Sequence, residues 1–198
     1  IGGVAAVNVN GTIRVPGDKS ISHRALMFSA LADGESRVTG LLDSADVRST
    51  AAVLGALGAS IRRDGDAVVV VGRGPRGLTT PVGDLDCGNS GTTARLMAGV
   101  VAAQSLSARF VGDASLSRRP MRRVSRPLEQ MGADIELPPH GGLPMTIHGG
   151  TLHEIVWESE VASAQVKSAI LLAALVAGVR ARVIEPSRTR DHTERMLQ

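Results

Sequence analysis

The chain has 198 residues, a formal net charge of +3 and 43% hydrophobic residues, which suits one large or two small globular domains and excludes an intrinsically disordered chain. A single cysteine, Cys87, excludes an internal disulfide and is typical of the reducing cytoplasm. The longest apolar run, residues 169–179, is too short to cross a membrane, so we expect a soluble cytoplasmic protein with no membrane partner.

The first helix is predicted to begin inside the stretch VPGDKSISHR, residues 15–24. A Pro-Gly turn leads into an acid, a lysine, two serines, a histidine and an arginine, and the apolar run ALMFSALA follows. Alternating strand-like residues come next, and then an amphipathic helix that ends at Gly58. The run AVVVVG at residues 67–72 predicts a further strand.

The same order of elements returns along the chain. LGALGASI at residues 54–61 returns as LEQMGADI at residues 128–135, 74 residues later. Arg24, Arg95 and Lys167, spaced 71 and 72 residues apart, each stand near the start of an Ala- and Leu-rich helix. The sequence therefore predicts an α/β fold of repeated βαβαββ units around buried helices.

The third unit is predicted to be incomplete. TRDHTERMLQ, residues 189–198, aligns with the start of a second helix but precedes the expected Gly-Ala pair and the two closing strands. We interpret the chain as a fragment, or as one piece of a split or cleaved protein. An isolated domain with a frayed terminus is the alternative.

Polar loops precede the buried helices, and stacking of the units is expected to bring the helix starts to one end of the domain. Helix N-termini offer unpaired N–H groups and a partial positive charge, so several of them at one cleft predict an anion-binding site. The residues expected there are the hydroxyls of Ser20, Thr92 and Ser163 and the cations of Lys19, Arg24, Arg95, Arg119 and Arg190.

Each of these residues taken singly has a plainer interpretation. Ser20 and Ser163 could be simple helix caps, and Arg24 and Arg95 could be structural ion-pair residues. Arg122, Arg123 and Arg126 are expected on a solvated helix face, and His23 is expected to be structural rather than a catalytic base. His153 and His192 have no partner at metal-ligand spacing, so no metal site is expected.

Five motifs in order, PGDKSISHR, GNSGTTARL, RRPM, SAQVKSAILLA and TRDHTERML, are similar to those of the 5-enolpyruvylshikimate-3-phosphate synthase family, over about residues 12–198. The resemblance implies a transferase of the shikimate pathway, without a cofactor, that moves the enolpyruvyl (carboxyvinyl) group of phosphoenolpyruvate to the 5-hydroxyl of shikimate-3-phosphate. It also implies that residues 1–12 form a strand segment of the other, absent domain and that residues 13–198 form the shikimate-3-phosphate-binding domain, truncated in its third repeat. The expected partner is the C-terminal half of the enzyme, without which we expect this fragment to be inactive.

The resemblance further implies roles for individual residues. Lys19 would be catalytic and would touch both substrates. Shikimate-3-phosphate would be held by Lys19, Ser20, Arg24, Ser163, Ala164, Gln165 and Arg190. Phosphoenolpyruvate would be held by Lys19, Gly91, Arg119 and Gln165, with Asn89, Thr92 and Arg95 in support.

Three positions bear on how this chain compares with the rest of the family. Ala164 stands where many members carry a second serine, so only its backbone would bind there. Arg190 stands where other members carry tyrosine, similar to the glyphosate-tolerant branch. Gly91 keeps the glycine of the glyphosate-sensitive members, so we expect this loop not to block the inhibitor sterically.

Two related families and one passive role are the alternatives. UDP-N-acetylglucosamine enolpyruvyl transferase shares the fold and chemistry, but that family has Lys-Asn where this chain has Lys19-Ser20, and often a cysteine where this chain has Ala114. A non-catalytic module that binds a phosphate or a nucleic-acid end is suggested by the related repeats of RNA 3′-phosphate cyclases. With 2% aromatic residues there is little to stack on bases, so we expect no nucleic-acid partner. In the third alternative, this half serves only as a folding partner of the other half.

Overall fold

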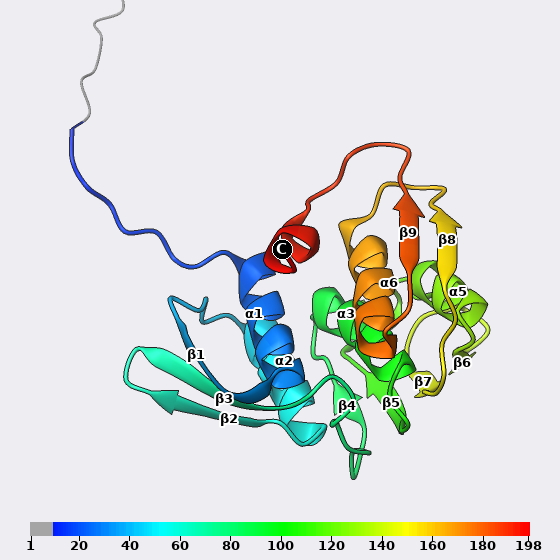
Figure 1. The fold of residues 1–198 in the computed structure, drawn as a ribbon, viewed down its shortest axis with the longest axis horizontal. Helices are drawn as coiled ribbons and strands as arrows, with labels where there is room; N and C mark the ends of the chain where they lie inside the picture. Colours follow the sequence, from blue (N-terminus) through cyan, green and yellow to red (C-terminus); the bar gives the residue numbers. More distant parts are fainter. Residues whose placement is uncertain (1–9) are drawn as a thin grey trace, which may run out of the picture.

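The computed structural model describes residues 10–198. In the first repeat, α1 (Lys19–Leu31) is followed by β1 (Asp33–Thr39), α2 (Ala45–Ala56), β2 (Ser60–Asp64) and β3 (Ala67–Arg73). The three strands form an antiparallel sheet in the order β1-β3-β2. Figure 1 shows this sheet and its two helices at one side of the molecule.

The strand with which the repeat should begin is missing from the first unit as described. Residues 10–18 form neither helix nor strand. They include Gly11, Pro16 and Gly17, which weaken a strand by chain entropy and by the missing proline N–H. Residues 1–9 of the segment assigned to another domain lie outside the described residues, so that assignment stays a prediction.

The second repeat has the complete βαβαββ order. It comprises β4 (Leu85–Asp86), α3 (Gly91–Ala102), β5 (Ser107–Val111), α5 (Arg122–Gln130), β6 (Asp134–Glu136) and β7 (Met145–His148), with one extra helical turn, α4 (Ala114–Ser117), before α5. β4 pairs in parallel with β5, and the sheet order is β4-β5-β7-β6. The predicted repeat register is confirmed by Gly58 and Gly132, 74 residues apart, which end equivalent helices with φ of 95° and 107°.

The third repeat is shorter, as predicted. β8 (Ile155–Glu158) pairs in parallel with β9 (Ala181–Ile184), and between them runs α6 (Ala164–Ala177), the longest helix described. α7 (His192–Met196) stands where the second helix of the unit should begin. On β8, Trp157 is partly buried and its indole N–H donates to Ser159 Oγ at 3.1 Å.

The core is built around the first helix of each repeat. α3 and α6 lie side by side in the middle of the molecule, between the sheets (Figure 1), and most of their residues are buried. Their backbones meet at Gly99, where a Cβ atom would stand 2.1 Å from the carbonyl oxygen of Ala169. The predicted burial of the Ala-rich helices is therefore confirmed, and small side chains are what allow the close approach.

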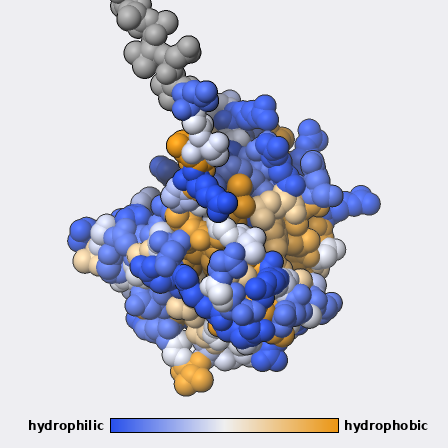
Figure 2. Space-filling view, turned by 90° about the vertical axis from the view of Figure 1, so that its left-hand side faces the viewer, coloured by the Kyte–Doolittle hydropathy of each residue, from blue (hydrophilic) through white to orange (hydrophobic). Residues whose placement is uncertain are grey.

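The surface is mostly polar on the side that Figure 2 faces, with smaller apolar areas between hydrophilic residues. Within residues 10–198, no helix combines the length and the apolar character that crossing a membrane requires.

Candidate functional site

The three buried helices begin with side-chain caps. The Asp18 carboxylate accepts from the Ile21 N–H at 2.8 Å at the start of α1, and Ser90 Oγ accepts from the Thr93 N–H at 3.1 Å at the start of α3. Ser163 Oγ accepts from the Val166 N–H at 3.4 Å at the start of α6. Ser163 is thus a helix cap, whereas Ser20 is not: its Oγ accepts from Arg24 Nη1 at 2.7 Å.

These helix starts converge on one cavity of about 250 Å³. Its walls come from α1, α3, α6 and the segment before α7, which confirms that the equivalent polar loops meet at one end of the domain. The lining residues are Asp18, Lys19, Ser20, His23, Arg24, Thr92, Ala164, Gln165 and Arg190. A shallower hollow continues from it along Ala162–Gln165, Thr189 and Arg190. Three cations against one carboxylate make this cavity suited to an anion.

Lys19, like Arg190, is exposed. Its Nζ lies 2.8 Å from Asp46 Oδ2, but its side chain remains 55% exposed. An exposed ion pair of this kind contributes little to stability, so an incoming anion competes with Asp46 at small cost. Lys19 therefore offers a mobile charge at the cavity mouth.

Arg24, in contrast, is buried and already heavily bonded. Nε donates to Thr193 Oγ1 at 2.7 Å, Nη1 to Ser20 Oγ at 2.7 Å and to the Ser20 carbonyl at 3.0 Å, and Nη2 to Ser168 Oγ at 2.6 Å. Burial lowers the pKa of Arg24, while the negative charge of Glu194 opposes that effect. Arg24 thus cross-links three elements as well as forming part of the cavity wall.

Gln165 connects the cavity to the start of α3. Its Oε1 accepts from Arg95 Nη1 at 3.1 Å, and its Nε2 donates to Thr92 Oγ1 at 2.9 Å. Arg95 also donates to the carbonyls of Gly91 at 3.4 Å and Pro120 at 3.2 Å. Burial, followed by the charges of Arg119 and Arg123, lowers the pKa of Arg95. The amide of Gln165 is therefore fixed in both position and orientation.

A second cationic cluster adjoins the first at Gly91. A Cβ atom on Gly91 would stand 2.5 Å from Arg95 Nη1 and 3.4 Å from Arg119 Nη1. Arg119 Nη2 donates to Asn89 Oδ1 at 2.5 Å, and Asn89 Nδ2 in turn donates to Asp113 Oδ2 at 2.6 Å. Asn89, Gly91, Arg95 and Arg119 are thus grouped beside the cavity rather than in its lining. The expected positions of Arg122, Arg123 and Arg126 on an exposed helix face are confirmed.

His23 is a structural residue, as expected, and it also contributes to the cavity lining, which the sequence did not predict. It is 0% exposed, its Nδ1 lies 2.7 Å from Thr50 Oγ1, and Thr50 Oγ1 lies 2.7 Å from Thr93 Oγ1. Burial lowers the pKa of His23 from 6.5 to about 4, so the ring is neutral at pH 7. His23 thus joins α1 to α2 and α3 beneath the cavity. Within residues 10–198, no three His, Cys, Asp or Glu side chains are grouped so that they could hold a metal ion.

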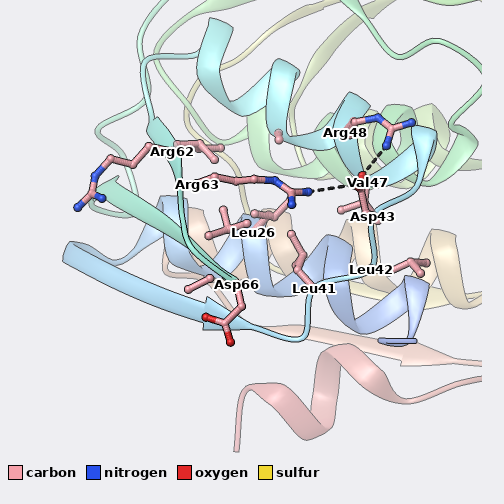
Figure 3. A pocket seen from close by; sticks show the side chains of 13 residues that line it. Leu26, Leu41, Leu42, Asp43, Val47, Arg48, Arg62, Arg63 and Asp66 are labelled. Carbon is pink, nitrogen blue, oxygen red and sulfur yellow. Dashed lines mark hydrogen bonds and ion pairs between the residues drawn. The ribbon is translucent and has the colours of Figure 1, made fainter. Parts of the chain in front are cut away.

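Another cavity, of about 230 Å³, lies between the β1–α2 connection and the β2–β3 hairpin (Figure 3). Leu26, Leu41, Leu42 and Val47 are among its lining residues, and Asp43 bonds both Arg48 and Arg63 at its rim. In the second repeat the longer β5–α5 connection contains α4, whose Ser117 carbonyl accepts from the Leu143 N–H on the β6–β7 connection. The first repeat has no such turn. Arg48 and Arg63 share Asp43, Arg62 lies 3.5 Å from Glu35 Oε2, and Asp66 adds a second carboxylate to the lining, so this cavity is less cationic than the first.

The comparisons with known proteins agree with this geometry. The family model for EPSP synthase (3-phosphoshikimate 1-carboxyvinyltransferase) matches residues 5–198. A 3-phosphoshikimate 1-carboxyvinyltransferase of Xanthomonas campestris pv. campestris (strain B100) is 55% identical over 191 residues, which are 96% of this chain and 44% of that protein. One of Brevibacillus brevis is 54% identical over 194 residues, covering 98% of this chain and 46% of that protein.

A solved structure of EPSP synthase from Acinetobacter baumannii superposes with a TM-score of 0.88 at 46% sequence identity, covering 94% of this chain and 43% of that one. This chain thus spans less than half the length of these relatives, and the match extends through all three helix starts around the cavity. The chain belongs to the EPSP synthase (3-phosphoshikimate 1-carboxyvinyltransferase) family.

Proposed function

We propose that this chain is the shikimate-3-phosphate-binding half of an enzyme that transfers the enolpyruvyl group of phosphoenolpyruvate to the 5-hydroxyl of shikimate-3-phosphate and releases phosphate. The observation that carries the proposal is the meeting of three helix N-termini with Lys19, Arg24 and Arg190 around one cavity. Both substrates are anions with a phosphate and a carboxylate, which is the chemistry that such a site favours.

In this proposal the first substrate occupies the main cavity. Shikimate-3-phosphate is held by the residues that line it, together with the cap of α6: Lys19, Ser20, Arg24, Ser163, Ala164, Gln165 and Arg190. The α6 N-terminus and Arg190 suit its phosphate, because N–H groups at the helix end and a guanidinium both donate to phosphate oxygens. Ala164 takes part through its backbone alone.

The second substrate would lie toward Gly91 and Arg119. Support for this comes from the fixed amide of Gln165, held by Thr92 and Arg95, and from Arg119, held by Asn89. Phosphoenolpyruvate approaches closely there because residue 91 has no side chain. Lys19 contacts both substrates in the proposal, and donors already held in place stabilise the charge that shifts to the departing phosphate.

The chain alone is proposed to bind the first substrate weakly and to have no measurable turnover, because the rest of the enzyme would supply the acid and base groups. The test is calorimetric titration of the chain with shikimate-3-phosphate at low and moderate salt. We expect saturable binding, weakened about tenfold to a hundredfold in Lys19→Ala, since a hydrogen bond to a charged group contributes roughly 1.5–3 kcal/mol. Arg62→Ala, an exposed arginine on β2, is the matched control and should bind as the original chain does.

Three outcomes would count against the proposal. One is the absence of binding by a chain that still unfolds cooperatively. The second is equal weakening by Lys19→Ala and Arg62→Ala. The third is tighter binding of a single-stranded oligonucleotide with a steep salt dependence, which would favour the nucleic-acid-end alternative because many phosphates are then contacted at once.

A further inference from the structure

Lys167 is the third of the basic residues that recur near the buried helix starts, but its charge is directed away from the cavity. Its Nζ lies 2.8 Å from Glu185 Oε2 and 2.8 Å from Glu194 Oε1. The side chains of Lys167 and Glu185 are 10% and 12% exposed. Burial alone would lower the pKa of Lys167, but the hydrogen bonds that its ammonium donates to Glu185 and Glu194 raise it above its ordinary value. One ammonium shared by two carboxylates has no charge left for a ligand.

The two carboxylates hold opposite ends of one segment. Glu185, just after β9, also accepts from Thr189 Oγ1 at 2.6 Å. Glu194 lies in α7 next to Thr193, whose Oγ1 accepts from Arg24 Nε at 2.7 Å and lies 2.8 Å from Ser168 Oγ. The segment from residue 185 to residue 194 is thus attached at both ends to α6, and at its far end also to α1. Arg190 stands between these attachments and lines the cavity and its shallow extension.

Removing Lys167 would leave two partly buried carboxylates facing one another without a cation. Unpaired charges in a protein interior are costly, and like charges repel, so the segment has reason to move out toward water. Glu194 Oε2 already lies buried without a hydrogen-bond partner, so this carboxylate depends on Lys167 through its other oxygen. Residues 185–191 form no helix or strand, so Arg190 depends on the attachments at the two ends of the segment, and Lys167 takes part in both.

We propose that Lys167 is a positioning residue. Together with Glu185 and Glu194 it clamps residues 185–194, and this clamp keeps the guanidinium of Arg190 in the lining of the anion cavity. The choice of ligand rests on the proposed function above, whereas the clamp itself does not. In each repeat the recurring basic residue then has a related task. Arg24 cross-links α1 to α6 and α7, Arg95 fixes Gln165, and Lys167 fixes the Arg190 segment.

The first test is a double-mutant cycle on binding of shikimate-3-phosphate. We expect Lys167→Met to weaken binding about tenfold, which is within the coupling that contacting residues show. If Lys167 acts through Arg190, the same substitution made in an Arg190→Ala background should change affinity less than about twofold. Lys167→Arg, which keeps the charge, should restore most of the lost affinity. Independent, additive effects of Lys167→Met and Arg190→Ala would overturn the inference.

The second test needs no ligand. Amide hydrogen exchange of Arg195 and Leu197, whose N–H groups donate to the carbonyls of Asp191 and Thr193 at 3.0 and 3.2 Å, should be accelerated about tenfold in Lys167→Met, with residues 91–102 of α3 unchanged, because only the clamped segment is released. Arg76→Met is the matched control, since Arg76 bonds the last carbonyls of the same helix α6, at the opposite end. It should leave the exchange of Arg195 and Leu197 unchanged. Unchanged exchange in Lys167→Met would refute the clamp.

These readouts separate the two proposals. Failure of the original chain to bind shikimate-3-phosphate refutes the proposed function, but the exchange experiment still decides on the clamp. If Lys167→Met does not fold, Glu194→Gln is the substitute. Glutamine has the shape of glutamate, and the Glu194 side chain is 34% exposed, so this substitution should disturb folding less. It should accelerate exchange in the same residues to a smaller extent. Exchange equal to that of the original chain would refute the inference.

Discussion

Gly99→Ala should destabilise the protein, although alanine normally stabilises a helix. Alanine in place of glycine inside a helix is worth about 0.5–1 kcal/mol in its favour. At Gly99, however, the new Cβ would stand 2.1 Å from the Ala169 carbonyl oxygen, 2.8 Å from its carbon and 3.0 Å from its Cα. Ordinary contact is about 3.5 Å, and the obstacle is backbone rather than a side chain that can rotate away. α3 and α6 must therefore move apart.

The size of the effect follows from opposing contributions. Overpacking of a core costs about 1–3 kcal/mol, and a clash between two helix backbones belongs at the upper end. After the gain in helix propensity, we expect a net loss of about 2 kcal/mol in the free energy of unfolding. Gly55→Ala is the matched control: Gly55 lies exposed in α2, and its new Cβ would meet nothing within 4 Å. Gly55→Ala should increase the free energy of unfolding by about 0.5–1 kcal/mol.

Urea unfolding followed by circular dichroism gives the change in the free energy of unfolding for each variant. The comparison is valid if this free energy falls with urea concentration at the same slope in all variants. The expected separation between the two variants is about 3 kcal/mol, well above the error of such measurements. Equal changes for the two glycines would show that α3 and α6 do not touch at Gly99. Loosening of this contact should also weaken binding of shikimate-3-phosphate, because the same helix pair positions Gln165 against Thr92 and Arg95.

Three further substitutions or conditions test the site and its surroundings. Gly91→Ala places a Cβ atom 2.5 Å from Arg95 Nη1, which must then move away from Gln165, so the free energy of unfolding should fall by about 1 kcal/mol, the typical contribution of one hydrogen bond. A complete enzyme carrying the substitution should bind phosphoenolpyruvate and glyphosate less well, and unchanged inhibition would contradict the argument. Because the pKa of His23 falls from 6.5 to about 4 on folding, the unfolded chain takes up a proton first as pH falls, and stability should drop by about 1.5 kcal/mol between pH 6.5 and pH 5. His23→Asn should flatten that dependence in urea titrations, and an unchanged slope would mean that His23 protonates freely in the folded chain. Burial raises the pKa of Cys87 to about 12, so thiol labelling at pH 8 should be on the order of a thousandfold slower than in urea, and rapid native labelling would place Cys87 at the surface.

The convergence of the polar loops was predictable because it depends on the repeat. The spacing of Arg24, Arg95 and Lys167 places three helix starts in register, and equivalent elements of stacked repeats necessarily share one end of the domain. Glycines at Gly58 and Gly132 likewise marked equivalent helix ends, since a positive φ favours glycine strongly. Periodicity and turn chemistry are local signals, and they carried most of the fold.

The hydrogen-bond and ion-pair partners of these basic residues could not be predicted from the sequence. Arg24 contacts Ser168 and Thr193, which are 144 and 169 residues further along the chain. Lys167 contacts Glu194 in α7, which follows β9 and a segment without helix or strand. No spacing rule relates such partners, because they depend on how far the α7 segment folds back. The same reason explains why Ser20, which looked like a cap, instead accepts from Arg24 while Asp18 takes the cap position.

The partly buried indole on β8 gives the molecule a built-in optical marker. The chain contains one tryptophan and no tyrosine, so its near-ultraviolet fluorescence comes from Trp157 alone. That residue lies on a two-stranded sheet in the third repeat, whereas the helical circular dichroism signal is spread over all three. Fluorescence therefore reports on unfolding of the third repeat, whereas circular dichroism reports on unfolding of the whole domain. If the third repeat opens before the other two, the fluorescence transition will precede the dichroism transition, and no added label is needed to see it.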